Sequence, residues 1–220
     1  MSFMGAVLRK NIPIWDRCAV TPFVRELQDG TLPLDCFKDY MIQDSIYLKH
    51  YARAYGKAIY HATVLRDIQL YYSILSFVTD TESAVRLSYL KQFGLTDHEI
   101  EFIAPLPENQ NYIDFLLETA EGGRECEILM AVLPCMLSYS YIFRKLAADP
   151  KSKESRYWDF IGDYADDRYA ESCKVWCDFA DQKCESLAEE DQKKLSAIFQ
   201  QASFLELAFW NMAYKRSANE

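Results

Sequence analysis

Apolar residues recur at steps of three and four along most of the chain, which is the spacing that one buried face of an α-helix requires. The clearest case is the segment from Leu34 to Ala62, LDCFKDYMIQDSIYLKHYARAYGKAIYHA, which has one glycine and no proline. Alternating apolar and polar positions, the pattern of a half-buried strand, are absent from the sequence. We therefore predict an all-α fold, a compact helical bundle.

Local signals mark where several other helices begin and end. The glycines of QDGT at 28–31 and of EGG at 121–123 are typical of helix ends. TDHE at 96–99 fits a capping box, in which Thr96 and Glu99 bond each other's backbone N–H groups. The further predicted helices are Gly5 to Cys18, a short helix from Pro22, Leu65 to Thr79, Glu82 to Phe93, Asp97 to Phe102, Tyr112 to Glu121, Arg124 to Leu146, Tyr157 to Ala165, Asp167 to Leu187 and Gln192 to Tyr214.

Length and composition favour one domain spanning residues 1–220. The chain has 220 residues, of which 50% are hydrophobic and 26% charged, so it can bury one substantial core. No linker rich in proline, glycine or serine divides it, and neither repeats nor low-complexity segments are evident. The sequence therefore predicts a single helical domain.

Charge and cysteine content narrow the classes of partner and compartment. A net charge of −9 disfavours a nucleic-acid partner, since such binding relies on clustered lysine and arginine. The short apolar patch at the N-terminus is followed at once by charges, so we interpret it as a helix and not as a signal peptide. We find no segment approaching the roughly 18 uncharged apolar residues of a membrane helix, and expect no membrane partner. An odd count of seven cysteines in a chain of this size indicates a reducing cytoplasm.

Two acidic residues stand on apolar helix faces. Asp44 and Tyr47 are three residues apart and share the inner face of the long helix. Glu206 is the single charge in QASFLELAFWNMAY. A buried carboxylate costs several kcal/mol unless it is bonded, so each acid either pairs with a structural partner or binds a ligand.

The segment AVLPCMLSYS contains a third unusual feature. Pro134 lacks the N–H that would bond the carbonyl of Met130, and a proline inside a helix costs roughly 3 kcal/mol. Cys135 follows it directly, and Tyr139 lies on the same face four residues later. This pattern makes Cys135 a candidate nucleophile.

The sequence lacks the motifs of several other catalytic and metal-binding classes of protein. The three histidines have no glutamate three residues before them, so the Glu-x-x-His pairs of di-iron bundles are missing. Cys173, Cys177 and Cys184 share a helix face, but no fourth ligand lies nearby in sequence, and we predict no metal site. Glycine-rich phosphate loops, G-x-S-x-G elbows and C-x-x-C pairs do not occur.

Four segments carry a family resemblance. They are PFVRELQDGTLPLDCFKDYMIQDSIYLKHYARAYGKAI, LPC, YWDFIGDYADD and ELAFWNMAY, in this order over almost the whole chain. Together they resemble the TenA family, thiaminase II or aminopyrimidine aminohydrolase, in its cysteine-containing class. The resemblance implies a haem oxygenase-like fold, a homotetramer, and thiamin salvage without a metal or cofactor. It also implies hydrolysis of 4-amino-5-aminomethyl-2-methylpyrimidine to the hydroxymethyl pyrimidine, and in many members cleavage of thiamin.

The same resemblance assigns three catalytic roles. The family's nucleophile falls on Cys135 and its acid on Glu206, in the E-x-x-F-W part of ELAFWNMAY. Tyr47 resembles the tyrosine that supports the thiolate.

Substrate-binding roles follow in the same way. The aspartate that holds the pyrimidine falls on Asp44 in IQDS. Tyr139, Tyr112 and Tyr164 resemble tyrosines of the substrate pocket. Two other functions stay open, a pyrimidine-binding or regulatory protein without turnover, and a related hydrolase of another heteroaromatic amine.

Overall fold

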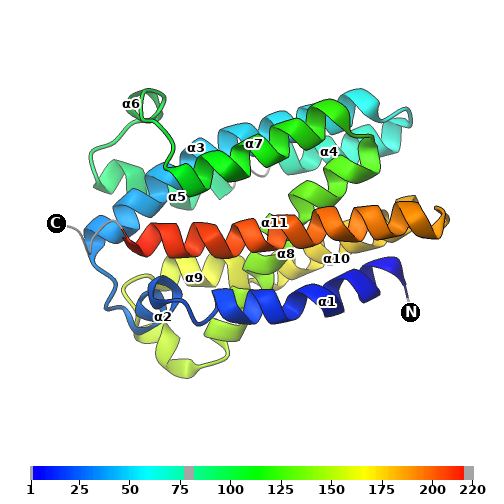
Figure 1. The fold of residues 1–220 in the computed structure, drawn as a ribbon. Coiled ribbons are helices and arrows are strands. Elements are labelled where there is room, and N and C mark those ends of the chain that lie inside the picture. The colour runs from blue at the N-terminus through cyan, green and yellow to red at the C-terminus, as the bar shows by residue number, and fades with distance from the viewer. Residues whose placement is uncertain (1, 77–81, 216–220) are drawn as a thin grey trace. The chain divides into compact units, whose positions relative to one another are not determined.

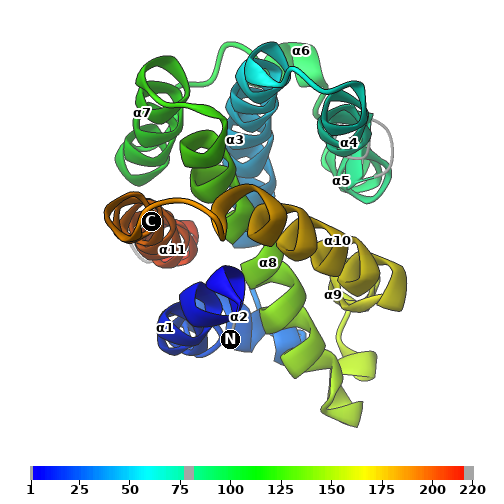
Figure 2. The same ribbon diagram turned by 90° about the vertical axis from the view of Figure 1, so that its right-hand side faces the viewer.

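The chain folds into α-helices joined by short connections, as a computed structural model shows for residues 2–76 and 82–215 (Figure 1; Figure 2 gives a second view). No strand occurs among these described residues, so the prediction of an all-α fold is confirmed. The helices are α1 (Phe3–Cys18), α2 (Pro22–Asp29), α3 (Leu34–His61), α4 (Leu65–Ser76), α5 (Glu82–Gln92), α6 (Asp97–Ile100), α7 (Pro107–Gly122), α8 (Glu125–Ala147), the 3₁₀ helix η2 (Pro150–Glu154), α9 (Trp158–Ala165), α10 (Asp167–Cys184) and α11 (Glu189–Lys215).

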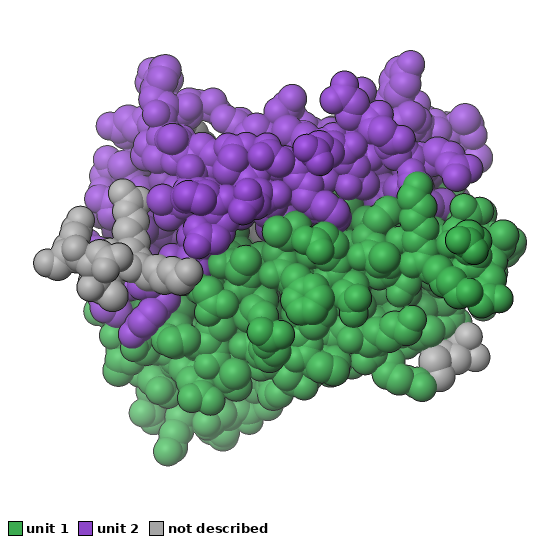
Figure 3. Space-filling model, viewed as in Figure 1, with its two compact units in different colours: residues 1–32, 129–211 green, residues 33–128, 212–220 purple. Residues whose placement is uncertain are grey.

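The helices group into two compact units, each assembled from segments far apart in sequence. Unit 1 comprises residues 1–32 and 129–211, and unit 2 comprises residues 33–128 and 212–220 (green and purple in Figure 3). Unit 1 therefore holds α1, α2, η2, α9, α10 and most of α8 and α11, whereas unit 2 holds α3 to α7 and the first turn of α8. A single domain over residues 1–220 stays a prediction.

In unit 2, the long helix α3 is the element on which α4, α5, α6 and α7 pack. Figure 2 shows α7 on one side of α3 and α4 with α5 on the other. The apolar stripe that predicted this helix is its buried face, including Phe37, Tyr40, Met41 and Tyr51. Fully burying a large apolar side chain is worth roughly 1.5–3 kcal/mol, so this stripe holds α3 among its neighbours.

In unit 1, α1 packs against α10 and also contacts α8 and α11 through one tryptophan. The indole N–H of Trp15 donates to the Ser203 hydroxyl on α11 at 3.2 Å. Its ring centroid lies 5.9 Å from that of Tyr141 on α8 and 6.0 Å from that of Phe199 on α11. A single side chain of α1 thus satisfies its polar atom and joins three helices of the unit.

The local signals at helix ends are confirmed. The Thr96 N–H donates to Glu99 Oε2 at 2.8 Å, and the Glu99 N–H donates to Thr96 Oγ1 at 3.3 Å. These bonds form the predicted capping box, and the hydrogen bonds that the Glu99 carboxylate accepts from the Thr96 backbone N–H and hydroxyl lower the pKa of that carboxyl. Gly30 closes α2 in the left-handed region with φ 72°. Gly123 follows α7 with φ −93°, which other residues can also adopt.

The start of α7 differs from the prediction in a way that matters for the site. We predicted a helix from Tyr112, but α7 begins at Pro107, five residues earlier. Proline suits the first turn of a helix, because its missing N–H has no partner there and its φ is already helical. Tyr112 therefore lies inside α7 and not at its end.

Two other differences concern α4 and η2. The structure describes α4 as far as Ser76, and the predicted continuation to Thr79 lies outside the described residues. The sequence did not predict η2, whose start is capped by the Asp149 carboxylate. A single turn of helix is too short to show apolar periodicity.

Helix α8 corrects the expectation that no segment is apolar enough to cross a membrane. It continues through Pro134, and by length and composition it could span one. However, 83% of its most apolar stretch is buried inside the protein. A core helix that is apolar on all sides meets the same criterion, so its burial accounts for its composition.

The connection after α2 is held by hydrogen bonds from the segment that follows η2. The Leu32 carbonyl accepts from the Arg156 guanidinium and, at 2.6 Å, from the Tyr157 hydroxyl. The chain passes close by at Gly30, where a Cβ atom would lie 3.1 Å from Ser155 Cα. Both features fix the chain within unit 1 just before α3 begins.

We expect Tyr157→Phe to lower the free energy of unfolding by about 1 kcal/mol, because it removes one buried donor while Arg156 still satisfies the carbonyl. Urea denaturation measures this difference. Tyr60→Phe is the matched control, since Tyr60 is 82% exposed and should leave stability unchanged. Equal stabilities for wild type and Tyr157→Phe would show that the bond to Leu32 adds nothing.

Candidate functional site

The predicted site residues fall into two groups, one in each unit. Asp44 and Tyr47 on α3 and Tyr112 on α7 belong to unit 2. The remaining residues belong to unit 1, and they are Cys135 and Tyr139 on α8, Tyr164 on α9 and Glu206 on α11.

In unit 2, the structure brings together two of the predicted tyrosines. The ring centroids of Tyr47 and Tyr112 lie 4.7 Å apart, and that of Tyr51 lies 5.6 Å from Tyr47. Asp44 stands one helical turn before Tyr47 and is 8% exposed. This group therefore combines a buried carboxylate with phenol rings, which present flat apolar faces and hydroxyl groups.

Two buried amides beside this group were missed by sequence reasoning. The Asn109 side-chain N–H donates to the Gln43 carbonyl at 2.8 Å and to Gln43 Oε1 at 2.9 Å. The backbone N–H of Leu106 also donates to Gln43 Oε1, at 2.9 Å. A signal for them was present in the sequence, because Gln43 is a polar residue next to the predicted Asp44 and Asn109 is one three positions before the predicted Tyr112.

In unit 1, Tyr139 belongs to an aromatic cluster. Its ring centroid lies 5.0 Å from that of Tyr164 and 5.1 Å from that of Trp210. Phe23 on α2 packs against Trp210 of this cluster, and the centroids of these two rings lie 5.6 Å apart. The structure thus brings together two predicted residues and adds Trp210 and Phe23, which sequence reasoning had assigned no role in the site.

Glu206 and Cys135 differ in exposure. Glu206 is 3% exposed and lies one turn before Trp210 on α11, whereas Cys135 is half-buried on α8. Burial and the nearby Glu206 carboxylate both raise the pKa of the Cys18 thiol. The predicted acid is therefore a buried carboxyl group with a thiol close to it, whereas the residue of the predicted nucleophile is only half-buried.

Two cysteines of α10 have thiols that we expect to be unreactive. All seven cysteines lie in the described part of the chain and none forms a disulfide. Burial raises the pKa of Cys173 to about 12, and burial followed by the Asp181 carboxylate raises the pKa of Cys177 to about 12. Because the thiolate is the reactive form, both residues are poor nucleophiles near neutral pH.

A metal centre finds no support in residues 2–76 and 82–215. Within these ranges, no group of three or more His, Cys, Asp or Glu side chains is arranged to hold a metal ion. Cys173 and Cys177, which the sequence placed on one helix face, line a groove instead.

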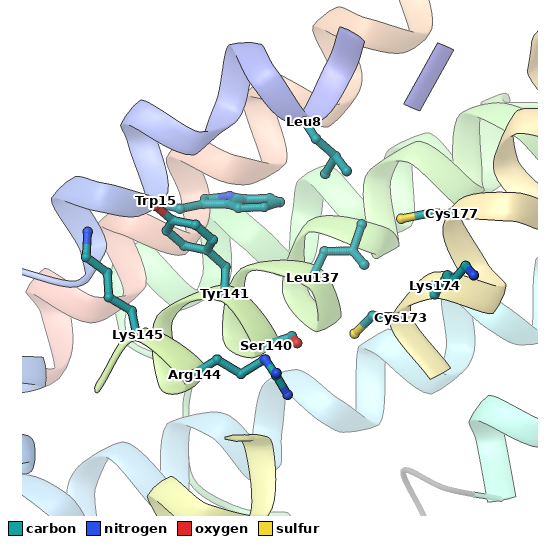
Figure 4. A pocket seen from close by; sticks show the side chains of 10 residues that line it. All are labelled: Leu8, Trp15, Leu137, Ser140, Tyr141, Arg144, Lys145, Cys173, Lys174 and Cys177. Atoms are coloured by element: carbon teal, nitrogen blue, oxygen red, sulfur yellow. The ribbon is translucent and has the colours of Figure 1, made fainter. Parts of the chain in front are cut away.

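That groove lies within unit 1 and has a volume of about 500 Å³. Figure 4 shows side chains of α1, α8 and α10 around it, with Leu8 and Leu137 near the two thiols. Two of its cations are already paired, Arg144 with Asp167 at 2.8 Å and Lys145 with Asp16 at 2.6 Å. None of the predicted site residues lines the groove, so it is separate from the candidate catalytic groups.

Comparison with known proteins assigns the chain to a family. The model of the TENA/THI-4/PQQC family matches residues 8–216, which is most of the sequence. The chain belongs to the TENA/THI-4/PQQC family. The resemblance carried by the four sequence segments is thereby confirmed.

Relatives of this TENA/THI-4/PQQC protein match along nearly their full length. The aminopyrimidine aminohydrolase of Halalkalibacterium halodurans is 31% identical, over 97% of this chain and 96% of its own. The solved TenA homologue from P. horikoshii OT3 is 28% identical with a TM-score of 0.87, covering 98% and 99% of the two chains. A domain from Shewanella denitrificans with a haem oxygenase-like fold, 16% identical, superposes with a TM-score of 0.73 over 98% and 93%, which supports that fold.

The rate of alkylation should distinguish Cys135 from the buried cysteines. With a small alkylating reagent near neutral pH, we expect Cys135 to be modified before Cys18, Cys173 and Cys177, because burial keeps those three protonated. Peptide mapping over a time course measures the order. Modification of Cys18 or Cys177 ahead of Cys135 would remove the reason to treat Cys135 as the reactive thiol.

Proposed function

We propose that this chain is a hydrolase of thiamin salvage, an aminopyrimidine aminohydrolase or thiaminase II. The observation that carries the proposal is the likeness to the enzyme of that name in Halalkalibacterium halodurans, 31% identical over 97% of this chain. The buried acids and tyrosine clusters add to it, because a flat heteroaromatic ring needs apolar walls with a few placed polar groups.

The proposed reaction starts with addition of the Cys135 thiolate to the ring carbon next to the one that bears the aminomethyl group. The aminomethyl nitrogen is protonated near neutral pH, so the electron pair released into the ring expels it as neutral ammonia and leaves an exocyclic methylene. Water adds to that methylene through its oxygen and gives up one proton to solvent, and the thiolate then leaves and restores the aromatic ring. A thiolate suits both steps, since it attacks a polarised carbon well and is also a good leaving group.

In this proposal, the two acids have different tasks. Glu206 supplies a proton or a hydrogen bond to a ring nitrogen, which makes the ring electron-poor enough to accept the thiolate. Asp44 holds the exocyclic amine or an adjacent ring nitrogen and so fixes the orientation of the ring. Both side chains are buried, which strengthens their interactions with a bound ring.

The four tyrosines complete the proposed set. Tyr47 supports the thiolate of Cys135, while Tyr112, Tyr139 and Tyr164 contact the substrate. Their packing in pairs, Tyr47 with Tyr112 and Tyr139 with Tyr164, supports this assignment because paired rings hold one another in place.

We also propose a cytoplasmic homotetramer that acts without metal or cofactor and binds neither nucleic acid nor membrane. The tetramer and the reaction without metal rest on the resemblance to TenA. The compartment rests on the cysteine content, and the absence of a nucleic-acid partner rests on the net charge of −9.

Turnover should depend on Cys135. The wild-type chain should release ammonia from 4-amino-5-aminomethyl-2-methylpyrimidine, and a parallel assay with thiamin should detect any release of the thiazole alcohol. Cys135→Ser should bind the hydroxymethyl pyrimidine but lose most turnover, because a serine hydroxyl is a far weaker nucleophile. Cys177→Ser is the matched half-buried control and should keep wild-type kcat. Near-normal kcat for Cys135→Ser would contradict covalent catalysis, and a wild type that binds pyrimidine without turnover would indicate a binding protein.

Glu206→Gln tests the acid. It keeps the shape of the side chain but removes its proton, so kcat should fall by roughly 10²-fold, the scale of general acid catalysis. Glu190→Gln, an exposed position in the first turn of the same helix, is the control and should change nothing. Steady-state kinetics and thermal unfolding should be measured together. Unchanged kcat with a lower unfolding temperature would make Glu206 a structural residue.

A further inference from the structure

Gln43 and Asn109 form a buried link between α3 and α7. Their relative exposures are 1% and 0%, and together with Leu106 they make three hydrogen bonds of 2.8–2.9 Å. Asn109 uses its N–H group for both the backbone and the side-chain oxygen of Gln43. Gln43 Oε1 accepts twice, so both of its lone pairs are used. We call these three residues the amide clamp.

The amide clamp fixes where α7 begins. Leu106 is the residue before the first turn of α7, and its own side chain provides no cap for the helix. Gln43 on α3 accepts the backbone N–H of Leu106 itself, which ties the residue just before α7 to α3 without capping the N–H groups of the first turn. The first turn of α7 is therefore attached to a defined position on α3.

The clamp lies one helical turn from the predicted substrate-binding group. On α3, Gln43 precedes Tyr47 by four residues and is next to Asp44, and on α7, Asn109 precedes Tyr112 by three. Residues three or four apart share a helix face. Along the pair α3 and α7, the contact of Gln43 with Asn109 is therefore followed by the contact of the Tyr47 ring with the Tyr112 ring. A shift of α7 that breaks the first contact must also move the second.

We propose that Gln43 and Asn109 are positioning residues, which hold Tyr112 against Tyr47, one helical turn after Asp44, in the geometry that binds the pyrimidine ring. This inference rests on the proposed function. The clamp itself touches no reacting atom, so its loss should weaken binding of the ring in ground state and transition state alike. That kind of loss raises KM and leaves kcat nearly unchanged.

The experiment compares Asn109→Leu and Gln43→Met with their double variant in the full chain. In each single variant we expect KM for the aminomethyl pyrimidine, and Kd for the hydroxymethyl pyrimidine by calorimetry, to rise about tenfold, with kcat within about threefold. The double variant should be weaker by much less than the product of the single effects, because both side chains belong to one contact. Gln110→Ala is the matched control, since the neighbouring amide is exposed and bonds Asp114 on its own helix.

A milder variant covers the case in which a substitution prevents folding, and the unfolding temperature distinguishes a positioning role from a structural one. Asn109→Ser retains a donor and should show a smaller rise in KM, which provides the answer if Asn109→Leu does not fold. Lower unfolding temperatures with wild-type KM and Kd would make the clamp merely structural and overturn the inference alone. A wild type that neither binds nor hydrolyses the pyrimidine would overturn the proposed function, and the inference with it.

Discussion

Removing polar side chains from water inside a helical core is unfavourable unless their atoms find new partners, and this constraint shapes both groups of candidate residues. In unit 2, Gln43 and Asn109 are almost fully buried, and Gln43 Oε1 accepts from Asn109 and from the N–H of Leu106 just before α7, while Gln43 Nε2 and Asn109 Oδ1 stay without a hydrogen-bond partner among the described residues. In unit 1, the Glu206 carboxyl is buried on a helix whose neighbouring positions are apolar. Such arrangements cost stability to maintain, which is why they mark functional candidates better than apolar packing does.

Aromatic rings provide the rigid surroundings in which these polar groups can be held. Tyr47 packs on Tyr112 in one unit, and Tyr139 packs on Tyr164 and Trp210 in the other. A tyrosine fills space like an apolar residue but ends in a hydroxyl, so a cluster of them can wall a heteroaromatic ring and still offer hydrogen bonds. The chemistry of a flat, nitrogen-rich substrate and the composition of the two clusters therefore agree.

Periodicity predicted α3 to within one residue of its end, because its apolar stripe is long and uninterrupted. It missed the first turn of α7, where PENQN is polar and the decisive features are Pro107 and a hydrogen bond from Leu106 to another helix. The contact of Gln43 with Asn109 joins residues 66 positions apart, so no local pattern could reveal it. The candidate residues were found through unusual residue types and a family resemblance, whereas their neighbours Trp210 and Phe23 looked like ordinary core.

The chemical nature of the amide clamp suits its position next to a carboxylate. A lysine or arginine could also have joined α3 to α7, but a charge beside Asp44 would shift the pKa of that carboxyl and compete with a ligand for it. Amide groups carry no net charge, and in the clamp the donors of Asn109 and Leu106 are directed at oxygens of Gln43. The register of the two helices can thus be fixed without setting the charge state of Asp44, the group that we propose orients the substrate.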